Sequence, residues 1–293
     1  MKIVFIIGTG RCGSTLLNEV LAKHKGVRFV STFEENHRSM PRKLRALSNK
    51  IYRQEHLPFV GKFAKQFRPT EAYGLIRQKV STIYVQPTRD LVAQDVNPWL
   101  SDKFRAFFQE NHSRNSHSVL VHKYTGWSRM GFFKSIFPEA KFVHVVRDGR
   151  AVANSWLQMP WWTGYQGPEQ WLWGPLDEQK RELWELHDRS FVALAGICWN
   201  KLTASYDRAS LDFSDEEYMQ IRYEDFISDP VSTSKSILDF AGLDWTSRFG
   251  KQLDSFDITS SRAQAYKRDL TLEQQAILES ISGEQLRNYG YEL

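Results

Sequence analysis

The chain of 293 residues holds only two cysteines, Cys12 and Cys198, and they lie far apart. Two distant cysteines support neither a disulfide framework nor a zinc site. No apolar run reaches the roughly 18–20 residues of a membrane-spanning helix. The apolar start, Met1–Ile7, leads directly into a glycine loop, which indicates a first strand instead of a signal peptide. We therefore expect a cytoplasmic protein in a reducing compartment.

A large excess of either charge is also lacking, since the chain has 39 Lys and Arg against 34 Asp and Glu and a net charge of +5. This excess suits an anionic ligand but, without a run of Lys or Arg, does not indicate nucleic acid. Hydrophobic residues make up 41% of the chain, as in ordinary globular proteins. No linker or internal repeat divides the sequence, so residues 1–293 are expected to form a single domain.

Short apolar runs rich in β-branched residues are typical of buried parallel strands. The clear ones are Lys2–Ile7, Ser118–His122, Lys141–Val146 and Tyr218–Arg222, and a weaker one is Val27–Ser31. Helical patterns lie between them, after residue 13 and over 130–137, 151–157, 182–208, 232–241 and 271–281. Gly242 is the expected C-cap of one helix, and Thr271 with Gln274 the capping box of the last. This alternation predicts an α/β fold with a central parallel sheet flanked by helices.

Two insertions interrupt the alternation, at roughly 38–115 and 156–181. The first is basic and helix-prone near its start, and the second carries five tryptophans with Gly and Pro between them. Ligands of parallel sheets bind beyond the carboxyl ends of the strands, where insertions usually form the walls. Exposed tryptophans stack on sugar rings, apolar chains or quaternary amines, but most aromatic side chains belong to a core.

A glycine loop, Gly8–Thr15, follows the first strand and opens a helix. In this setting backbone N–H groups converge on an anion, and the helix dipole adds to the field. The frame is that of a P-loop, except that Ser14 occupies the position of the lysine that reaches the terminal phosphates of ATP or GTP. Arg11 supplies positive charge from inside the loop instead. The loop therefore indicates an anion at a helix N-terminus and disfavours triphosphate chemistry.

A second segment that could bind an anion begins at Arg147, which ends the strand at 141–146. Ser155 lies two helical turns further on, and an arginine and a hydroxyl so placed can hold one phosphate between them. Asp148 stands near the helix start, where its charge interacts favourably with the dipole. A surface arginine beside an N-cap aspartate would produce the same pattern, so this segment alone leaves both interpretations open.

Together the two segments resemble the sulfotransferases that use 3′-phosphoadenosine 5′-phosphosulfate (PAPS), most closely the bacterial branch and the tyrosylprotein sulfotransferases. Gly8–Leu17 is similar to the family's 5′-phosphosulfate loop and Arg147–Ser155 to its 3′-phosphate motif. Further similar segments follow in family order, at 122–124, 222–230, 266–271 and 289–291. The resemblance is weakest over 38–115 and 159–181, where the acceptor would be chosen.

The resemblance implies a set of PAPS-binding residues in a single P-loop-type domain. Those for the 5′-phosphosulfate are Gly10, Arg11, Cys12, Gly13, Ser14 and Thr15. Those for the rest of the donor are Arg147 and Ser155 on the 3′-phosphate, Lys267 or Arg268 closing over it, and Tyr223 near the adenine. Cys12 is most simply explained as a small residue that fits the loop.

The resemblance also implies catalytic roles. Sulfuryl transfer requires in-line placement and positive charge at the leaving oxygen, and Arg11 and Lys123 are the candidates for that charge. The segment Phe33–His37 resembles an acidic segment of the family and makes Glu35 the general base, with Glu34 and His37 as alternatives. A sulfuryl group is less charged than a phosphoryl group, so no metal is expected.

Other functions stay open at this point. A P-loop kinase or NTPase is disfavoured by Ser14, and a nucleotide-binding module without turnover is disfavoured by Glu35 and Lys123. The acceptor could be a small molecule, a glycan, a lipid or a peptide, with a hydroxyl expected before an amine. The sequence indicates neither the acceptor nor an oligomeric state.

Overall fold

The structure is a computed structural model that describes residues 1–37, 41–54, 61–85, 87–111 and 118–293, without the side chains of 42–46, 62 and 111. Its centre is a sheet of five parallel strands in the order β2-β3-β1-β4-β5. The strands are β1 (Ile3–Ile7), β2 (Val27–Arg28), β3 (Val119–Lys123), β4 (Lys141–Val146) and β5 (Tyr218–Arg222).

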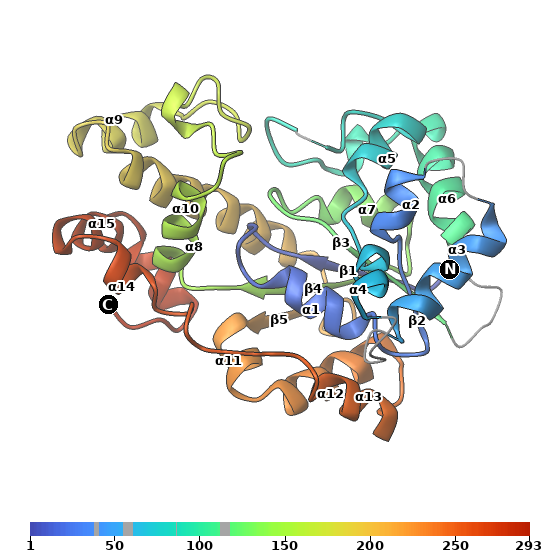
Figure 1. Ribbon diagram of the computed structural model, residues 1–293. Coiled ribbons are helices and arrows are strands. Elements are labelled where there is room, and N and C mark those ends of the chain that lie inside the picture. Colours follow the sequence, from blue (N-terminus) through green and yellow to red (C-terminus); the bar gives the residue numbers. More distant parts are fainter. Residues whose placement is uncertain (38–40, 55–60, 86, 112–117) are drawn as a thin grey trace.

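Helices surround this sheet (Figure 1). In the described part of the chain they are α1 (Ser14–Leu21), α2 (Thr32–Asn36), α3 (Arg42–Tyr52), α4 (Gly61–Ala64), α5 (Tyr73–Lys79), α6 (Pro98–Asn111), α7 (Met130–Ile136), α8 (Gly149–Leu157), α9 (Glu178–Leu186), α10 (Phe191–Ser210), α11 (Tyr223–Ser228), α12 (Pro230–Ala241), α13 (Ser247–Leu253), α14 (Tyr266–Asp269) and α15 (Leu272–Asn288). Short 3₁₀ helices are η1 (Lys65–Phe67), η2 (Ala93–Asp95) and η3 (Gly164–Gln166). The predicted caps are present, since Gly242 has φ 70° and Thr271 forms a capping box with Gln274.

The central strand β1 is buried on both faces, as its unbroken apolar sequence predicts. Ile3, Phe5 and Ile7 point into one hydrophobic cluster, whereas Val4 and Ile6 point into another. Since successive side chains of a strand face opposite sides, helices must cover both faces of the sheet. The α/β fold with a parallel sheet flanked by helices is therefore confirmed.

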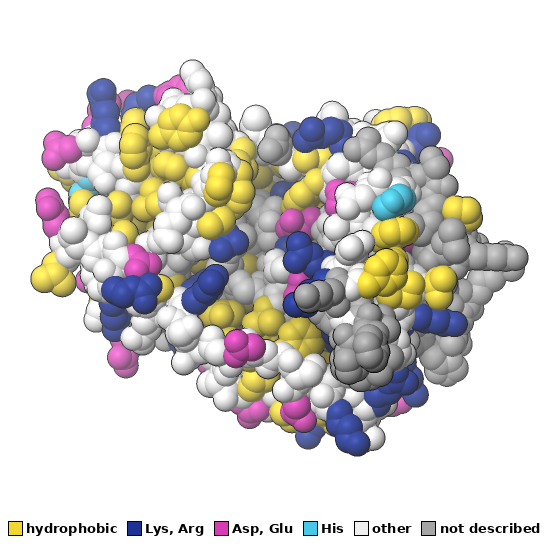
Figure 2. Space-filling model, in the orientation of Figure 1, with side chains coloured by type: hydrophobic (Ala, Val, Ile, Leu, Met, Phe, Trp, Pro, Cys, Tyr) yellow, Lys and Arg dark blue, Asp and Glu magenta, His cyan; other side chains and the backbone are white. Residues whose placement is uncertain are grey.

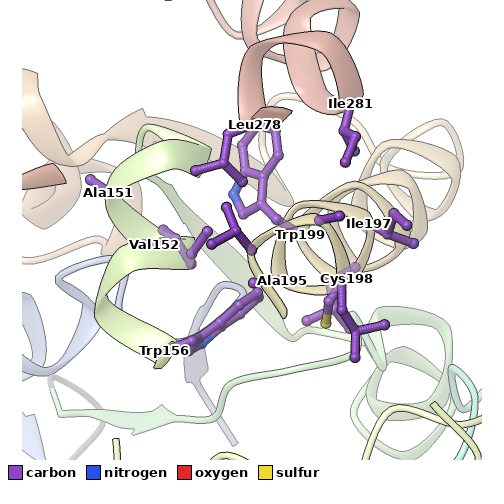
Figure 3. Packing of buried hydrophobic residues seen from close by; sticks show 14 of the residues in the cluster. Ala151, Val152, Trp156, Ala195, Ile197, Cys198, Trp199, Leu278 and Ile281 are labelled. Atoms are coloured by element: carbon purple, nitrogen blue, oxygen red, sulfur yellow. The ribbon is translucent and has the colours of Figure 1, made fainter. Parts of the chain in front are cut away.

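A third hydrophobic cluster joins α8, α10 and α15 beside the sheet (Figure 3). Trp156 and Trp199 are fully buried in it, together with Cys198. A Cβ at Gly149 would lie 2.6 Å from the Trp199 ring, so a side chain at the start of α8 would push α10 away. This packing fixes the position of α8, the helix that carries Ser155.

The weaker predicted strand, Val27–Ser31, is shorter than expected. Only Val27 and Arg28 pair with β3. Beyond them the side-chain amide of Asn49 hydrogen-bonds both backbone groups of Phe29. It accepts from the N–H at 3.2 Å and donates to the carbonyl at 3.0 Å. Ser31 then caps α2, with its hydroxyl accepting from the Glu34 N–H. A side chain thus replaces the parallel ladder at Phe29, and the next pairing, between Ser31 and Pro69, is an isolated antiparallel bridge.

The single helix expected over 182–208 is wrong, because the structure has two helices there, α9 and α10. The backbone of Asp188 and Arg189 is left-handed, with φ of 52° and 55°, which no helix interior permits. Ser190 then caps α10 through a hydrogen bond from the Ala193 N–H. The Asp-Arg-Ser sequence at 188–190 was the local signal of this break.

Candidate active site

The loop between β1 and α1 has the backbone of an anion-binding nest. Gly10, Arg11 and Gly13 all have positive φ, of 85°, 55° and 89°. Such a run turns successive N–H groups toward one point, next to the N-terminus of α1. Gly13 is required for a second reason, since a Cβ there would lie 2.1 Å from the ring of Tyr223. Cys12 is fully buried below the loop and does not line either of the cavities described next.

The two segments singled out in the sequence meet at Arg11. Its Nε donates to the Oγ of Ser155 at 2.8 Å, and its carbonyl accepts from Nη1 of Arg147 at 2.9 Å. The Arg147 guanidinium also lies 4.8 Å from the centre of the Tyr223 ring, a cation–π contact. Residues from the loops after β1 and β4 and from α8 and α11 are therefore assembled into one wall.

This wall borders a cavity of about 560 Å³, here called the helix-side cavity. Among the predicted donor-binding residues, its lining includes Arg11, Gly13, Ser14, Thr15, Arg147, Ser155, Tyr223 and Arg268. Lys267 is exposed and is not part of this lining. Arg262, which sequence reasoning missed, does line the cavity, and its carbonyl accepts from Nη2 of Arg147 at 2.5 Å.

The electrostatics of the helix-side cavity favour an anion. Burial lowers the pKa of Arg11, and the positive charges of Arg147 and Arg262 lower it further. A guanidinium whose pKa is depressed by like charges is stabilised when a negative ligand arrives. The arrangement of arginines therefore suits a phosphate bearing more than one negative charge.

On the other side of the loop lies a cavity of about 370 Å³, here called the strand-edge cavity. Lys123 ends β3 and points into it, with Nζ donating to the Thr15 hydroxyl at 2.8 Å. The same Nζ lies 3.1 Å from Oε1 of Glu71, which also accepts from the Thr125 hydroxyl at 3.0 Å. Lys123 is only 7% exposed, so this charge is held in place beside the loop.

The two cavities share Arg11, Ser14 and Thr15. A ligand held by its phosphate groups in the helix-side cavity can therefore present its far end to the strand-edge cavity. Gly10, from the same loop, lines the strand-edge cavity but not the helix-side cavity. The geometry suits transfer of a group from an anion bound on one side of the loop to an acceptor bound on the other.

Glu35, the predicted base, binds backbone and hydroxyl groups of the first insertion. Its Oε2 accepts from the Thr70 hydroxyl at 2.7 Å and its Oε1 from the Gly74 N–H at 2.9 Å. Glu34 is buried and completes the capping box of α2 by accepting from the Ser31 N–H at 2.8 Å. His37 hydrogen-bonds the Phe33 carbonyl. None of the three is among the described residues that line the strand-edge cavity.

Both insertions supply walls of the strand-edge cavity. The first contributes Glu71, Tyr73, Val85 and Pro87, although its residues 38–40, 55–60, 86 and 112–115 lie outside the described chain. The second contributes an aromatic wall through Trp161 and Trp173. Trp156, Trp162 and Trp171 are buried outside this lining, so much of the tryptophan cluster is core, whereas Trp161 remains 45% exposed.

Glu71, Thr125 and Arg262 escaped the sequence reasoning. Glu71 precedes a helix of only seven residues, and no apolar periodicity or neighbouring motif marks it. Thr125 follows Lys123 by two residues, and that spacing was the one available signal.

Within the described residues no group of three or more His, Cys, Asp or Glu could hold a metal ion. No helix in the same part of the chain is both long and apolar enough to cross a membrane.

Comparison with known proteins agrees with this geometry. Residues 4–247 match the sulfotransferase family. Over 99% of its length the chain is 22% identical to the omega-hydroxy-beta-dihydromenaquinone-9 sulfotransferase Stf3 of Mycobacterium bovis and of Mycobacterium tuberculosis, covering 75% of each.

Two solved structures share the fold. The sulfotransferase STF9 of Mycobacterium avium superposes with a TM-score of 0.62 at 14% identity, over 100% of this chain and 78% of the other. The sulfotransferase domain of the curacin biosynthetic pathway gives 0.54 at 17% identity, over 100% and 98%. With a family match that spans most of its length and a fold shared with these enzymes, the chain belongs to the sulfotransferase family.

Proposed function

We propose that the protein transfers a sulfuryl group from PAPS to a hydroxyl group of an apolar acceptor. The observation that carries this proposal is the pair of cavities that meet at Arg11, Ser14 and Thr15. One is rich in arginine and suits the nucleotide, and the other has aromatic walls and suits an acceptor. The loop between them lies where a transferred group would pass.

The helix-side cavity fits a donor with two separate anionic groups. The 5′-phosphosulfate would accept from the backbone N–H groups of the loop and from the hydroxyls of Ser14 and Thr15. The 3′-phosphate would bind Arg147 and Ser155, with Arg262 and Arg268 at the same cavity. Tyr223, which also lines this cavity and holds the Arg147 guanidinium against its ring, would contact the adenine.

Transfer requires that the acceptor oxygen form a bond to sulfur while the bond from sulfur to the bridging phosphate oxygen breaks. Negative charge develops on that bridging oxygen, and adenosine 3′,5′-bisphosphate (PAP) leaves. Lys123 and Arg11 are the cations on the two sides of the loop that would stabilise it. Lys123 is already oriented by its hydrogen bond to Thr15, so little reorganisation is needed.

A base must take the proton of the acceptor hydroxyl, and the geometry favours Glu71 over Glu35 for this role. Glu71 lines the strand-edge cavity, next to Lys123 and Thr125. Glu35 binds Thr70 and Gly74, the residues on either side of Glu71, and so acts as its support. A candidate base has to be within hydrogen-bond reach of the proton it removes, which only a group in the cavity achieves.

The acceptor is proposed to be an apolar alcohol. The apolar side chains that line the strand-edge cavity are Trp127, Trp161, Leu172, Trp173, Val85 and Pro87. Aromatic and aliphatic walls bind a hydrophobic chain or ring, while Glu71 and Thr125 offer the few polar groups that would orient a hydroxyl. The mycobacterial relatives are named for a menaquinone-derived alcohol, which fits this chemistry.

The decisive experiment is incubation of the purified protein with labelled PAPS and a panel of acceptors, followed by mass spectrometry. The panel should contain prenyl and polyprenyl alcohols, quinone-derived alcohols, sugars and tyrosyl peptides. We expect a mass gain of one SO3 on an apolar alcohol, with release of PAP. Binding of PAP without transfer to any acceptor would favour a module without turnover, and Mg²⁺-dependent phosphate release from ATP would favour a kinase or NTPase.

A further inference from the structure

A second positively charged pocket lies away from the two cavities described above. It has a volume of about 290 Å³, and its lining joins the ends of α1 and α3 to β2 and α13. Figure 2 shows Lys and Arg side chains gathered toward the lower right, where Figure 1 places α13 and β2. The cations that line this basic pocket are Lys23, Lys25, Arg28, Lys50, Arg53 and Arg248.

The basic pocket stands at the opposite edge of the sheet from the phosphate loop. Helix α1 begins at the loop after β1 and runs back along the sheet, for about 12 Å at 1.5 Å per residue. Lys23 and Lys25 follow its last turn, and Arg28 lies in β2 itself. A ligand bound here would therefore not occupy the donor or acceptor cavity.

Two of the cations have a structural explanation. Arg53 is 8% exposed, and it donates through Nε to the Ala22 carbonyl at 3.2 Å and through Nη2 to the Val27 carbonyl. Lys23 donates to the Tyr52 carbonyl at 2.9 Å. The Ala22 carbonyl follows the last residue of α1 and the Tyr52 carbonyl ends α3, and a cation is stabilised at such helix C-termini. These contacts hold the floor of the basic pocket in place.

The remaining four cations have no such explanation. Within the described residues, Lys25, Arg28, Lys50 and Arg248 form no ion pair with a carboxylate, and no Asp or Glu lines the pocket. They come from the turn after α1, from β2, from α3 and from α13, so no helical periodicity explains why they converge. Three of them are exposed at the rim, and Arg28 is half-buried.

The convergence is electrostatically costly in the absence of an anion. Burial, followed by the charges of Arg28 and Arg248, lowers the pKa of Arg53 to about 9. Burial also lowers the pKa of Arg28. Like charges around a buried guanidinium raise the free energy of the empty pocket, and a bound anion would remove that repulsion.

We propose that the basic pocket binds a ligand carrying a pyrophosphate or a phosphomonoester with at least two negative charges. The buried Arg53 forms the floor of the site. Arg28 and Arg248 contribute guanidinium groups to its walls, and Lys25 and Lys50 lie at its rim. The volume of the pocket exceeds the roughly 30 Å³ share of a single water about tenfold, which leaves room for a diphosphate. The same chemistry occurs in soluble phosphates and in lipid headgroups. This proposal does not depend on the proposed function.

The test is calorimetric titration of inorganic pyrophosphate into protein saturated with PAP, so that the donor cavity is occupied. We expect one further binding event. The double variant Arg28→Gln/Arg248→Gln should weaken it at least about tenfold, the usual effect of losing charge-assisted hydrogen bonds. The control Lys2→Gln/Lys251→Gln removes the same net charge outside the pocket and should bind as the original protein does.

Two further arms keep the test decisive. If Arg28→Gln/Arg248→Gln lowers the thermal midpoint, the rim variant Lys25→Gln/Lys50→Gln replaces it, because both side chains are exposed. Sedimentation with phosphatidylcholine vesicles containing phosphatidic acid examines the lipid source. Binding of pyrophosphate or of these vesicles that the pocket variants lose and the control retains supports the proposal. Absence of both, or equal binding by the pocket variants and the control, overturns it.

Discussion

Oε1 of Glu71 lies 3.1 Å from Nζ of Lys123, at the edge of the cavity proposed to hold the acceptor. In the proposed transfer the two groups would have opposite tasks, since Glu71 would take the acceptor's proton and Lys123 would stabilise the leaving oxygen. Their contact keeps both next to the phosphate loop before any substrate arrives. The same contact distinguishes Glu71 from Glu35, because the carboxylate oxygens of Glu35 accept hydrogen bonds from Thr70 and Gly74 instead.

The first prediction concerns the base. Glu71→Gln should lower kcat by about 10²–10⁴-fold, the usual contribution of a general base, and leave the Kd for PAP nearly unchanged. Glu35→Gln should have a smaller effect on kcat and a larger effect on the thermal midpoint, because it supports residues 70 and 74. Steady-state kinetics and calorimetry on both variants decide between them. A slow but stable Glu35→Gln beside an active Glu71→Gln would reassign the base to Glu35.

The second prediction concerns the 3′-phosphate. Ser155→Ala should weaken PAP binding by about tenfold, because it removes a neutral hydrogen bond. Arg147→Ala should weaken it by about a hundredfold or more, because a charge-assisted hydrogen bond is stronger. Binding of adenosine 5′-phosphosulfate, which lacks the 3′-phosphate, should change much less. Lys267→Ala is the matched control, since that side chain is outside the helix-side cavity. Equal losses for both nucleotides would argue that Arg147 acts only on the loop.

The third prediction tests the loop itself. Gly13→Ala should abolish nucleotide binding and lower stability, because its φ is 89° and its Cβ would lie 2.1 Å from the Tyr223 ring. The double variant Gly13→Ala/Tyr223→Ala removes the clash but keeps the left-handed backbone, which costs about 1–2 kcal/mol for a residue with a Cβ. Denaturant unfolding should therefore show partial recovery. Full recovery would mean that the backbone conformation of Gly13 does not matter.

The fourth prediction concerns pH. His122 is fully buried among Phe5 and Phe108, and burial lowers its pKa to about 3. The unfolded chain binds this proton below about pH 6.5 and the native state does not, so stability falls as pH drops from about 6.5 toward 3, by up to about 1.4 kcal/mol per pH unit. His122→Leu should flatten this dependence and keep or raise stability at pH 7, because neither ring nitrogen has a hydrogen-bond partner within the described structure. Urea unfolding at pH 7 and at pH 5 measures the slope, and an unchanged slope would contradict the argument.

The fifth prediction concerns the aromatic wall. Trp161 is 45% exposed and lines the strand-edge cavity, so Trp161→Ala should leave the fold intact. Loss of its contact with an apolar acceptor should raise KM by about tenfold, as expected for about 1–2 kcal/mol of lost apolar contact, with PAP affinity unchanged. An unaltered KM for every apolar acceptor that the enzyme sulfates would remove Trp161 from the acceptor site.

Much of the site near the phosphate loop could be predicted because it is encoded locally. The glycines that permit the left-handed turn, the strand before them and the helix after them are adjacent in the sequence. Lys123 and Arg147 end strands, and parallel strands bring their carboxyl ends to one edge. The exceptions are Cys12 and Lys267, which line neither cavity, and Arg262, which the loop before α14 brings against Arg147.

The sequence by itself determined the parallel sheet, the phosphate loop and the family, since each depends on short-range periodicity or on residues adjacent in the chain. Only the tertiary structure decided which carboxylate lines the strand-edge cavity. Glu34, Glu35 and Glu71 are equally polar in the sequence, and the hydrogen bonds of Glu35 to Thr70 and Gly74 were needed to distinguish them. The basic pocket was equally hidden, because its cations come from four segments that only packing brings together.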